Sequence, residues 1–309
     1  EELKLASPKY NLGVGSCSPG KQISLMLERI EEILLKENPD VVLVQGDTNS
    51  VLAGALAAKK ANLKVGHVEA GLRSYDESMP EEHNRILVDH ISDFLFASTE
   101  DAAQKIDNEG IKKEKVYVVG NTVVDAVYQN GDIAEQSKNI LKSLGLEKNE
   151  YIITTAHRPA NVDSPVQLKK LVDGLNGVVK ELQLPLIFAV HPRTKNCIEK
   201  AKFILDDLVK LIDPVGYLDF LQLLKNAKLI ITDSGGIQEE ASVLKVPCVT
   251  TRENTERPET LTLGCNILSG VEPEKMIACA KEMVNKSRDW NSPYGDGKTG
   301  ERIVEIINQ

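Results

Sequence analysis

The chain has 309 residues, of which 41% are hydrophobic and 27% charged, and its net charge at pH 7 is −9. At roughly 150 residues per domain, this length predicts two domains, each large enough to bury its own core. The composition excludes a disordered, collagen-like or coiled-coil protein. The acidic balance argues against a nucleic-acid or anionic-membrane partner, so an anionic ligand would need a local basic site.

Features typical of secreted or membrane proteins are lacking in the sequence. The five cysteines are scattered and include no C-x-x-C pair, which is typical of reduced thiols inside the cell. The longest apolar runs are far shorter than the roughly 20 residues of a membrane helix. We therefore expect a cytoplasmic protein.

Short runs rich in Val and Ile alternate with amphipathic stretches of helical length. The runs are apolar on both faces, which predicts buried parallel strands over 41–44, 65–68, 94–97, 116–119, 151–155, 186–190, 229–232 and 248–251. Helices are predicted over 21–36, 49–60, 80–92, 165–182, 218–225, 236–244 and 300–307. This alternation predicts an α/β fold built from doubly wound sheets.

A polar stretch over 130–150 separates the first four predicted strands from the last four. We place the domain boundary there, which gives Rossmann-like domains at 1–133 and 134–297 that face a central cleft. The C-terminal helix, within 298–309, is compatible with packing back on the first domain. The 41–44 strand would leave an unpaired apolar edge, so we expect the natural gene to encode about 50 further residues that add a strand and a helix.

Carboxylates follow the predicted strands at their carboxyl ends, where open parallel sheets bind ligands. Asp47 follows the first strand, Glu69 the second, and Glu81 begins the next helix. Carboxylates gathered in a partly dry cleft repel one another, so at least one is expected to hold a proton near neutral pH, as acid–base catalysis requires. Each alone is more typical of a helix cap or a surface salt bridge. His67, Glu69 and Glu81 match no standard metal-ligand spacing, so no metal is predicted.

Residues 233–240 read Asp-Ser-Gly-Gly-Ile-Gln-Glu-Glu, which predicts a strand end, a Gly-rich turn and a helix start. Backbone N–H groups at Ser234, Gly235 and Gly236 suit a diphosphate, because the positive end of the helix dipole lies there. A carboxylate such as Glu240 suits ribose hydroxyls, although the same stretch also fits a capped connection without a ligand. No dinucleotide or P-loop motif is present, and no cofactor is expected.

Cationic side chains that could bind phosphate lie at several strand ends. Arginine matches phosphate oxygens in pairs, although each of these residues alone is more typical of a surface salt bridge. They are His157, Arg158, His191, Arg193, Arg252 and Arg257.

Taken in order, eight segments resemble the non-hydrolysing UDP-N-acetylglucosamine 2-epimerase family. They include Val-Gln-Gly-Asp-Thr at 44–48 and His-Val-Glu-Ala-Gly-Leu-Arg at 67–73, and the others are 80–85, 119–125, 156–158, 191–193, 233–240 and 255–259. The resemblance implies two Rossmann-like domains of the glycosyltransferase-B type and reversible C2 epimerisation of UDP-N-acetylglucosamine to UDP-N-acetylmannosamine. In that reaction UDP is eliminated to leave a glucal and is then added back, which requires two acid–base groups.

Matched motif by motif, the resemblance also implies roles for individual residues. The acid–base groups would be Asp47, Glu69 and Glu81, with Arg85 and His157 nearby. The UDP phosphates would lie on Ser234, Gly235, Gly236 and Arg257, and the ribose on Glu240. Some members of the family bind a second substrate molecule as an activator, and His191 and Arg158 are the candidates here. A homodimer is also expected.

Two departures from the family pattern stand out. The His-Arg motif of the family continues with Arg-Glu-Asn, whereas Pro159, Ala160 and Asn161 follow Arg158. The Gly-Thr-Arg-Pro-Glu turn that opens the family has no match in residues 1–40.

Three other functions stay open at this point. A hydrolysing epimerase shares the motifs and differs only in admitting water to the intermediate. A nucleotide-sugar sensor would keep the binding residues and lose the acid–base carboxylates, but all three carboxylates are present. A glycosyltransferase would need an acceptor groove, for which the sequence gives no signal.

Overall fold

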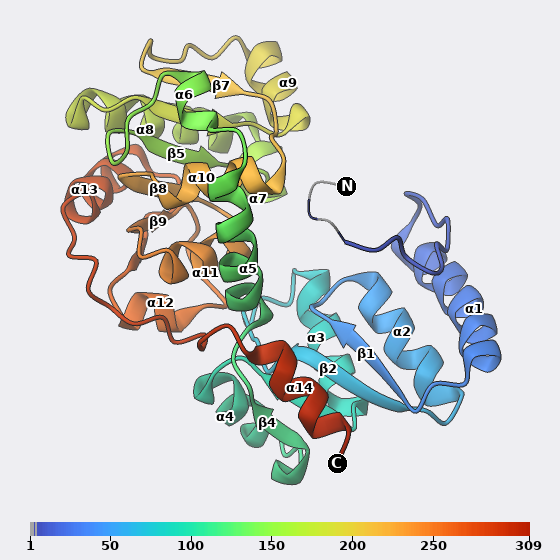
Figure 1. Ribbon diagram of the computed structural model, residues 1–309. Coiled ribbons are helices and arrows are strands. Elements are labelled where there is room, and N and C mark those ends of the chain that lie inside the picture. The colour runs from blue at the N-terminus through green and yellow to red at the C-terminus, as the bar shows by residue number, and fades with distance from the viewer. Residues whose placement is uncertain (1–2, 4) are drawn as a thin grey trace. The chain divides into compact units, whose positions relative to one another are not determined.

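The structure is a computed structural model that describes residue 3 and residues 5–309. The described chain divides into two compact units (Figure 1), one of residues 5–125 with 294–309 and the other of residues 126–293. The division falls inside helix α5 (Thr122–Gln136), whereas the sequence placed the boundary between 133 and 134. The polar stretch that suggested a linker begins as the last turns of this helix. Within the described ranges, no helix is both long and apolar enough to cross a membrane.

The unit of residues 5–125 and 294–309 contains a parallel sheet of order β1-β2-β3-β4. Its strands are β1 (Val41–Gln45), β2 (Lys64–Ala70), β3 (Phe94–Ala97) and β4 (Val116–Val118). Its main helices are α1 (Pro19–Glu37), α2 (Asn49–Lys60), α3 (Pro80–Ile91), α4 (Glu100–Asn108) and α14 (Thr299–Ile307). Successive side chains of β3 face opposite sides of the sheet, so Leu95 and Ala97 pack with α4 while Phe96 packs with Ile303 of α14.

The unit of residues 126–293 contains a parallel sheet of order β10-β9-β8-β5-β6-β7. Its strands are β5 (Ile152–Thr155), β6 (Leu186–Ala189), β7 (Val209–Ile212), β8 (Leu229–Thr232), β9 (Cys248–Thr250) and β10 (Asn266–Leu268). From the central β5–β8 pair, the chain adds β6 and β7 on one side of the sheet and β9 and β10 on the other. This reversal is the topological switch point at which nucleotide folds bind ligands, at the carboxyl ends of the strands.

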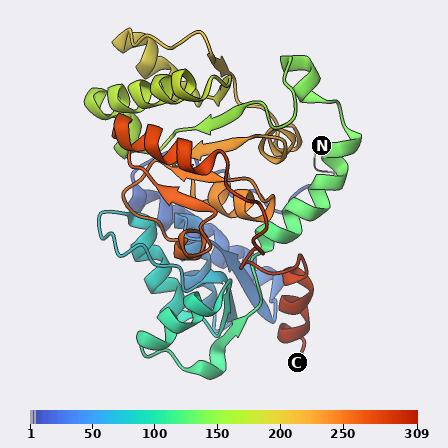
Figure 2. The same cartoon turned by 90° about the vertical axis from the view of Figure 1, so that its left-hand side faces the viewer.

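Helices cover both faces of the six-stranded sheet (Figure 1, Figure 2). They are α6 (Ile140–Leu144), α7 (Pro159–Val162), α8 (Pro165–Leu182), α9 (Pro192–Ala201), α10 (Tyr217–Lys225), α11 (Gly235–Val243), α12 (Pro258–Thr262) and α13 (Pro273–Met283). One core packs α8 and α13 against Ile152 and Ile231, and the other packs α6, α10 and α11 against Ile153 and Ile230. Both faces of the central strands are therefore buried, which explains their uninterrupted apolar sequences.

Candidate active site

Asp47 lies in the loop between β1 and α2 and is held by helix α3. Its carboxylate accepts hydrogen bonds from Arg85 at 3.1 Å (Nε) and 2.6 Å (Nη2), and its backbone carbonyl accepts one from the Asn84 side chain at 2.8 Å. Arg85 also donates to the buried Glu82 at 2.7 Å. The structure thus joins Asp47 and Arg85 directly, as the sequence grouped them, and adds Glu82, which the prediction did not include.

Glu82 fixes the loop that precedes α3. Its carboxylate accepts hydrogen bonds from the backbone N–H groups of Ser74 and Tyr75 and from the Ser74 hydroxyl. Burial would raise the pKa of Glu82, but these hydrogen bonds and the Arg85 guanidinium lower it below its ordinary value. Arg85 is therefore held between two carboxylates, of which only Asp47 is partly exposed.

Glu69 occupies a β-bulge at the end of β2, where the pairing with β3 shifts register between Val68 and Ala70. Its φ is +70°, a left-handed conformation that residues other than glycine rarely adopt. Glu69 Oε2 lies 3.7 Å from the position that a Cβ on Gly46 would take. The Glu69 carboxylate therefore lies against the residue that directly precedes Asp47.

Glu81 lies on the exposed side of the first turn of α3. The buried side of the same helix carries Glu82, Arg85 and Asp89. Of the three predicted carboxylates, Asp47 and Glu69 follow neighbouring strands, whereas Glu81 shares with them only the helix whose buried side contacts Asp47.

Asp233, directly after β8, organises the turn that follows β5. Its buried carboxylate accepts hydrogen bonds from the backbone N–H groups of His157 and Arg158 and from the side chain of Asn161, and it lies 2.9 Å from Nδ1 of His157. Burial would raise the pKa of Asp233, but the His157 contact and the backbone hydrogen bonds lower it. The switch point of the sheet therefore holds His157 and Arg158 in place.

Three arginines surround the buried Glu256. Arg252 Nη2 lies at 2.9 Å, Arg257 Nη1 at 3.3 Å and Arg158 Nη2 at 3.5 Å from its carboxylate oxygens. Burial opposes ionisation, but the charges of Arg257 and Arg252 lower the pKa of Glu256 to about 2. Among the described residues, Nη1 of the buried Arg252 has no hydrogen-bond partner. Because Arg257 also pairs with Glu239, this Nη1 of Arg252 is the group here that suits an anion.

The start of α11 adjoins this cluster. The side chain of Ser234 caps the helix by accepting a hydrogen bond from the N–H of Ile237, and a Cβ on Gly235 would lie 2.9 Å from Glu256 Oε1. A Cβ on Gly236 would meet open space. Arg257 is also fixed by a 2.8 Å hydrogen bond from its Nε to Glu239. The structure thus brings together Ser234, Gly235 and Arg257, which the sequence assigned to phosphate.

Glu240 lies further along α11 with 9% of its surface exposed. It accepts a 3.1 Å hydrogen bond from the Tyr217 hydroxyl of α10. Burial raises the pKa of Glu240 to about 7, and the Tyr217 hydrogen bond opposes the rise.

Arg158 and His191, the candidates for a second substrate site, have different partners. Arg158 lies beside Asp233 and Glu256. His191 caps α9, where its Nδ1 accepts a hydrogen bond from the N–H of Arg193. No group of three or more metal-ligating side chains occurs in the part of the chain that the structure describes.

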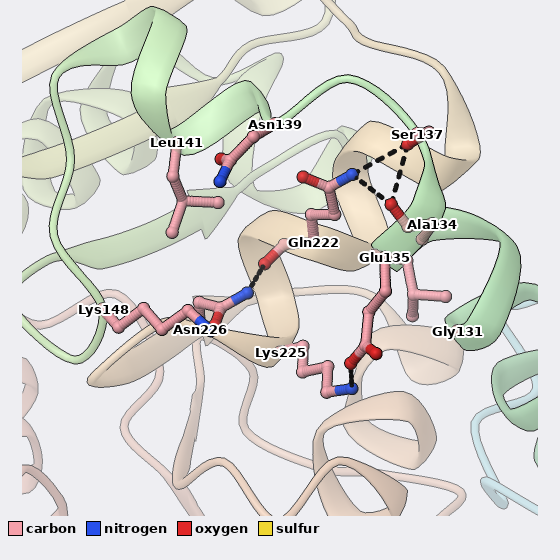
Figure 3. A pocket seen from close by; sticks show the side chains of 11 residues that line it. Gly131, Ala134, Glu135, Ser137, Asn139, Leu141, Lys148, Gln222, Lys225 and Asn226 are labelled. Carbon is pink, nitrogen blue, oxygen red and sulfur yellow. Dashed lines mark hydrogen bonds and ion pairs between the residues drawn. The ribbon is translucent and has the colours of Figure 1, made fainter.

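A surface pocket of about 330 Å³ lies elsewhere in the unit of residues 126–293, between α5, α6 and α10 (Figure 3). Several of its polar side chains are already hydrogen-bonded or paired. Gln222 donates to the carbonyl of Ala134, and Lys225 pairs with Glu135. None of its lining residues belongs to the charged clusters at the strand ends.

Sequence reasoning missed Asp89 and the central roles of Glu82, Asp233 and Glu256. One signal was available in α3, because Glu82, Arg85 and Asp89 recur at the spacing of the helix and so share one face. Glu256 gave no such signal, since one of its partners, Arg158, lies 98 residues away in the sequence.

Comparison with known proteins identifies the family. Residues 1–308 match the family model described as UDP-N-acetylglucosamine 2-epimerase. The chain belongs to this family. A UDP-N-acetylglucosamine 2-epimerase of Methanococcus maripaludis is 54% identical over 99% of this chain and 86% of the relative. The UDP-2,3-diacetamido-2,3-dideoxy-D-glucuronate 2-epimerase of Pseudomonas aeruginosa is 40% identical over 99% of this chain and 85% of the relative.

A solved structure shares the fold. The crystal structure of Methanocaldococcus jannaschii UDP-GlcNAc 2-epimerase, in complex with UDP-GlcNAc and UDP, superposes with a TM-score of 0.93 at 52% identity, covering 99% of this chain and 86% of that one. The predicted family, the enzyme class and the α/β fold with two Rossmann-like units are thereby confirmed.

Proposed function

We propose that this enzyme interconverts UDP-N-acetylglucosamine and UDP-N-acetylmannosamine by eliminating UDP and adding it back. The observation that carries the proposal is the placement of two carboxylates on neighbouring strand ends: Asp47 after β1, and Glu69 on the bulge of β2 with its carboxylate against Gly46. Epimerisation without a redox cofactor needs two groups that exchange protons with C2, one for each face of the sugar.

The proposed reaction has two reversible halves. A base removes the C2 proton while the C1–O bond breaks, and its electron pair leaves with UDP to give a 2-acetamidoglucal. A proton then returns to the opposite face of C2, and a phosphate oxygen of UDP re-forms the bond to C1. Asp47 and Glu69 share the two proton transfers, and Glu81 is a third candidate in the same region. The Arg85 guanidinium lies against the Asp47 carboxylate and holds that carboxylate in position.

UDP would bind at the switch point of the six-stranded sheet. The N-terminus of α11 offers the N–H groups of Gly235 and Gly236 beside Ser234, and Arg257 and Arg252 supply positive charge. The buried Nη1 of Arg252 would gain a phosphate oxygen as an acceptor. Glu240 would accept hydrogen bonds from the ribose hydroxyls, and His157, held by Asp233, would lie beside the phosphates.

Product analysis tests this function. The enzyme is incubated with UDP-N-acetylglucosamine, and UDP-N-acetylmannosamine, free N-acetylmannosamine and free UDP are quantified. We expect the epimeric UDP-sugar with only traces of free UDP. Equal amounts of free N-acetylmannosamine and UDP would show a hydrolysing enzyme instead. A parallel incubation with UDP-2,3-diacetamido-2,3-dideoxyglucuronate, the substrate in the name of one relative, tests the sugar specificity.

A second substrate site at His191 and Arg158 is a separate proposal. If it operates, the dependence of rate on UDP-N-acetylglucosamine is sigmoidal, and His191→Ala makes it hyperbolic. A hyperbolic curve that the variant leaves unchanged would exclude the site. The cytoplasmic location and the homodimer expected from the sequence stay predictions.

A further inference from the structure

A network of four charged side chains, of which only Glu109 is partly exposed, connects the ends of β1 and β2. Asp89 of α3 and His67 of β2 have no exposed surface, and Arg73 is 2% exposed. Asp89 Oδ1 lies 2.6 Å from His67 Nδ1, and its Oδ2 lies 2.8 Å from Arg73 Nη2. Arg73 continues to Glu109 with two hydrogen bonds of 2.6 and 2.8 Å. Apolar residues can often replace buried ion pairs without loss of stability, so stability alone does not account for this network.

The hydrogen bonds of His67 define its charge. Its Nε2 lies 2.9 Å from the backbone carbonyl of Gly46, which can only accept. Its Nδ1 faces the Asp89 carboxylate, which accepts when ionised. Both ring nitrogens therefore donate, and the imidazole is a cation. Burial opposes both charges, but the hydrogen bond and charge of Asp89 raise the pKa of His67. The hydrogen bond and charge of His67, together with Arg73, lower the pKa of Asp89.

The network reaches the backbone next to both proposed proton-transfer groups. Gly46, which binds His67, has φ +82° and directly precedes Asp47. Gly71 donates its N–H to Asp89 Oδ2 at 3.1 Å and lies two residues after Glu69. The backbone of Gly71 is tightly enclosed, since a Cβ there would lie 2.3 Å from the carbonyl oxygen of Ala102. The Asp89 carboxylate thus binds the segment after Glu69 directly and the segment before Asp47 through His67.

We propose that Asp89 is a positioning residue for proton transfer, acting on the Asp47 loop through His67 and on the Glu69 turn through Gly71. The inference rests on the proposed function, because it assigns Asp89 to the same two acid–base groups. The left-handed backbone of Glu69 costs free energy and persists only where neighbouring contacts enforce it, and the Gly71 hydrogen bond is such a contact. The charge of the nearby Glu69 also raises the pKa of His67.

The test compares Asp89→Asn with a matched variant at the far end of β2. Asp93 also binds a β2 backbone N–H, that of Val65 at 2.8 Å, and a cation, Lys59 at 3.0 Å, but it lies at the start of the strand. For each variant we measure kcat for epimerisation and the Kd of UDP. Asparagine at position 89 keeps the shape of the side chain but has one acceptor oxygen in place of two. It turns an N–H toward His67 or Gly71, so one of the two hydrogen bonds is lost.

We expect Asp89→Asn to lower kcat by about 10- to 100-fold, the scale on which small misplacements of reacting groups act. The Kd of UDP should stay within about twofold, because the UDP-binding residues belong to the other unit. Asp93→Asn should leave both quantities near those of the unaltered enzyme. A near-normal kcat for Asp89→Asn, or an equal loss in Asp93→Asn, would overturn the proposal.

His67→Gln serves if Asp89→Asn does not fold. Glutamine can still donate to the Gly46 carbonyl but carries no charge, so kcat falls with UDP binding retained, and normal turnover of this variant would also refute the proposal. The two proposals fail differently. If the unaltered enzyme yields no epimer, the proposed function is wrong, whereas an active enzyme that tolerates Asp89→Asn removes only the positioning role.

Discussion

Replacement of Glu240 by glutamine is expected to stabilise the unit of residues 126–293 at alkaline pH and to do so much less in mild acid. Burial raises the pKa of Glu240 to about 7 from an ordinary value of 4.5, with the Tyr217 hydrogen bond opposing the rise. The folded protein thus holds the proton more tightly than the unfolded chain. Glu240 stabilises the fold fully below the unfolded pKa, and that contribution is lost as the pH rises through the folded pKa.

The magnitude follows from the two pKa values. The difference between about 7 and 4.5, at about 1.36 kcal/mol per pH unit, corresponds to about 3 kcal/mol over the whole range. Between about pH 5 and about pH 8.5 the expected change is about 2–3 kcal/mol, because some of the loss has already occurred at the lower pH. Glutamine keeps the shape of the side chain and does not titrate. Any effect of the amide itself is the same at both pH values and cancels in the difference.

Urea unfolding followed by tryptophan fluorescence measures this change. The single tryptophan, Trp290, is buried in the same unit and donates a hydrogen bond to the Ser242 carbonyl of α11, the helix that carries Glu240. Glu274→Gln, at an exposed glutamate of the same unit, is the matched control and should show no such change. If Glu240→Gln and the unaltered protein differ by the same free energy of unfolding at both pH values, Glu240 does not titrate near neutrality and the reasoning fails.

Three further predictions concern the reaction itself. Asp47→Asn and Glu69→Gln should each lower kcat by about 10²-fold or more while the Kd of UDP stays within a few fold; near-normal turnover would remove that residue from the proton transfers. Arg257→Ala should weaken UDP binding by about 1.5–3 kcal/mol, the usual contribution of a hydrogen bond to a charged group, and unchanged affinity in calorimetry would limit Arg257 to its pairing with Glu239. The KM for UDP-N-acetylglucosamine should rise as the pH falls below about 7, because a protonated Glu240 is a poorer acceptor for ribose hydroxyls, and Glu240→Gln should abolish this dependence. A KM that does not vary with pH would contradict the ribose assignment.

The sequence predicted the central elements well because their signals are local. Three elements have the predicted bounds: helix α2 (Asn49–Lys60), helix α8 (Pro165–Leu182) and strand β3 (Phe94–Ala97). Each has a clear apolar pattern, and its ends are marked in the sequence by a proline, by polar residues or by a neighbouring strand. The missed strands β7 and β10 lie at the edges of their sheet. Strand β7 reads Val-Lys-Leu-Ile and β10 only Asn-Ile-Leu, so neither has the continuous apolar run by which the other strands were found.

The candidate site was predicted in part. The residues that were missed are those whose partners come close only in the tertiary structure. Strand-end rules and the family motifs pointed to Asp47, Glu69 and Arg257, because those residues follow strands or lie in recognisable turns. They did not point to Asp89 or Glu256, whose partners are brought close only by folding. The left-handed Glu69 was equally unforeseen, since a β-bulge depends on the register of a neighbouring strand.

The central claim, epimerisation through elimination and re-addition of UDP, is tested most directly by the fate of the C2 hydrogen. The enzyme is given UDP-N-acetylglucosamine in heavy water, and the UDP-N-acetylmannosamine formed is examined by NMR and mass spectrometry. Because the C2–H bond breaks and the returning proton comes from a carboxyl group that exchanges with solvent, the product should carry deuterium at C2. Epimeric product that retains the original hydrogen at C2 would contradict the mechanism.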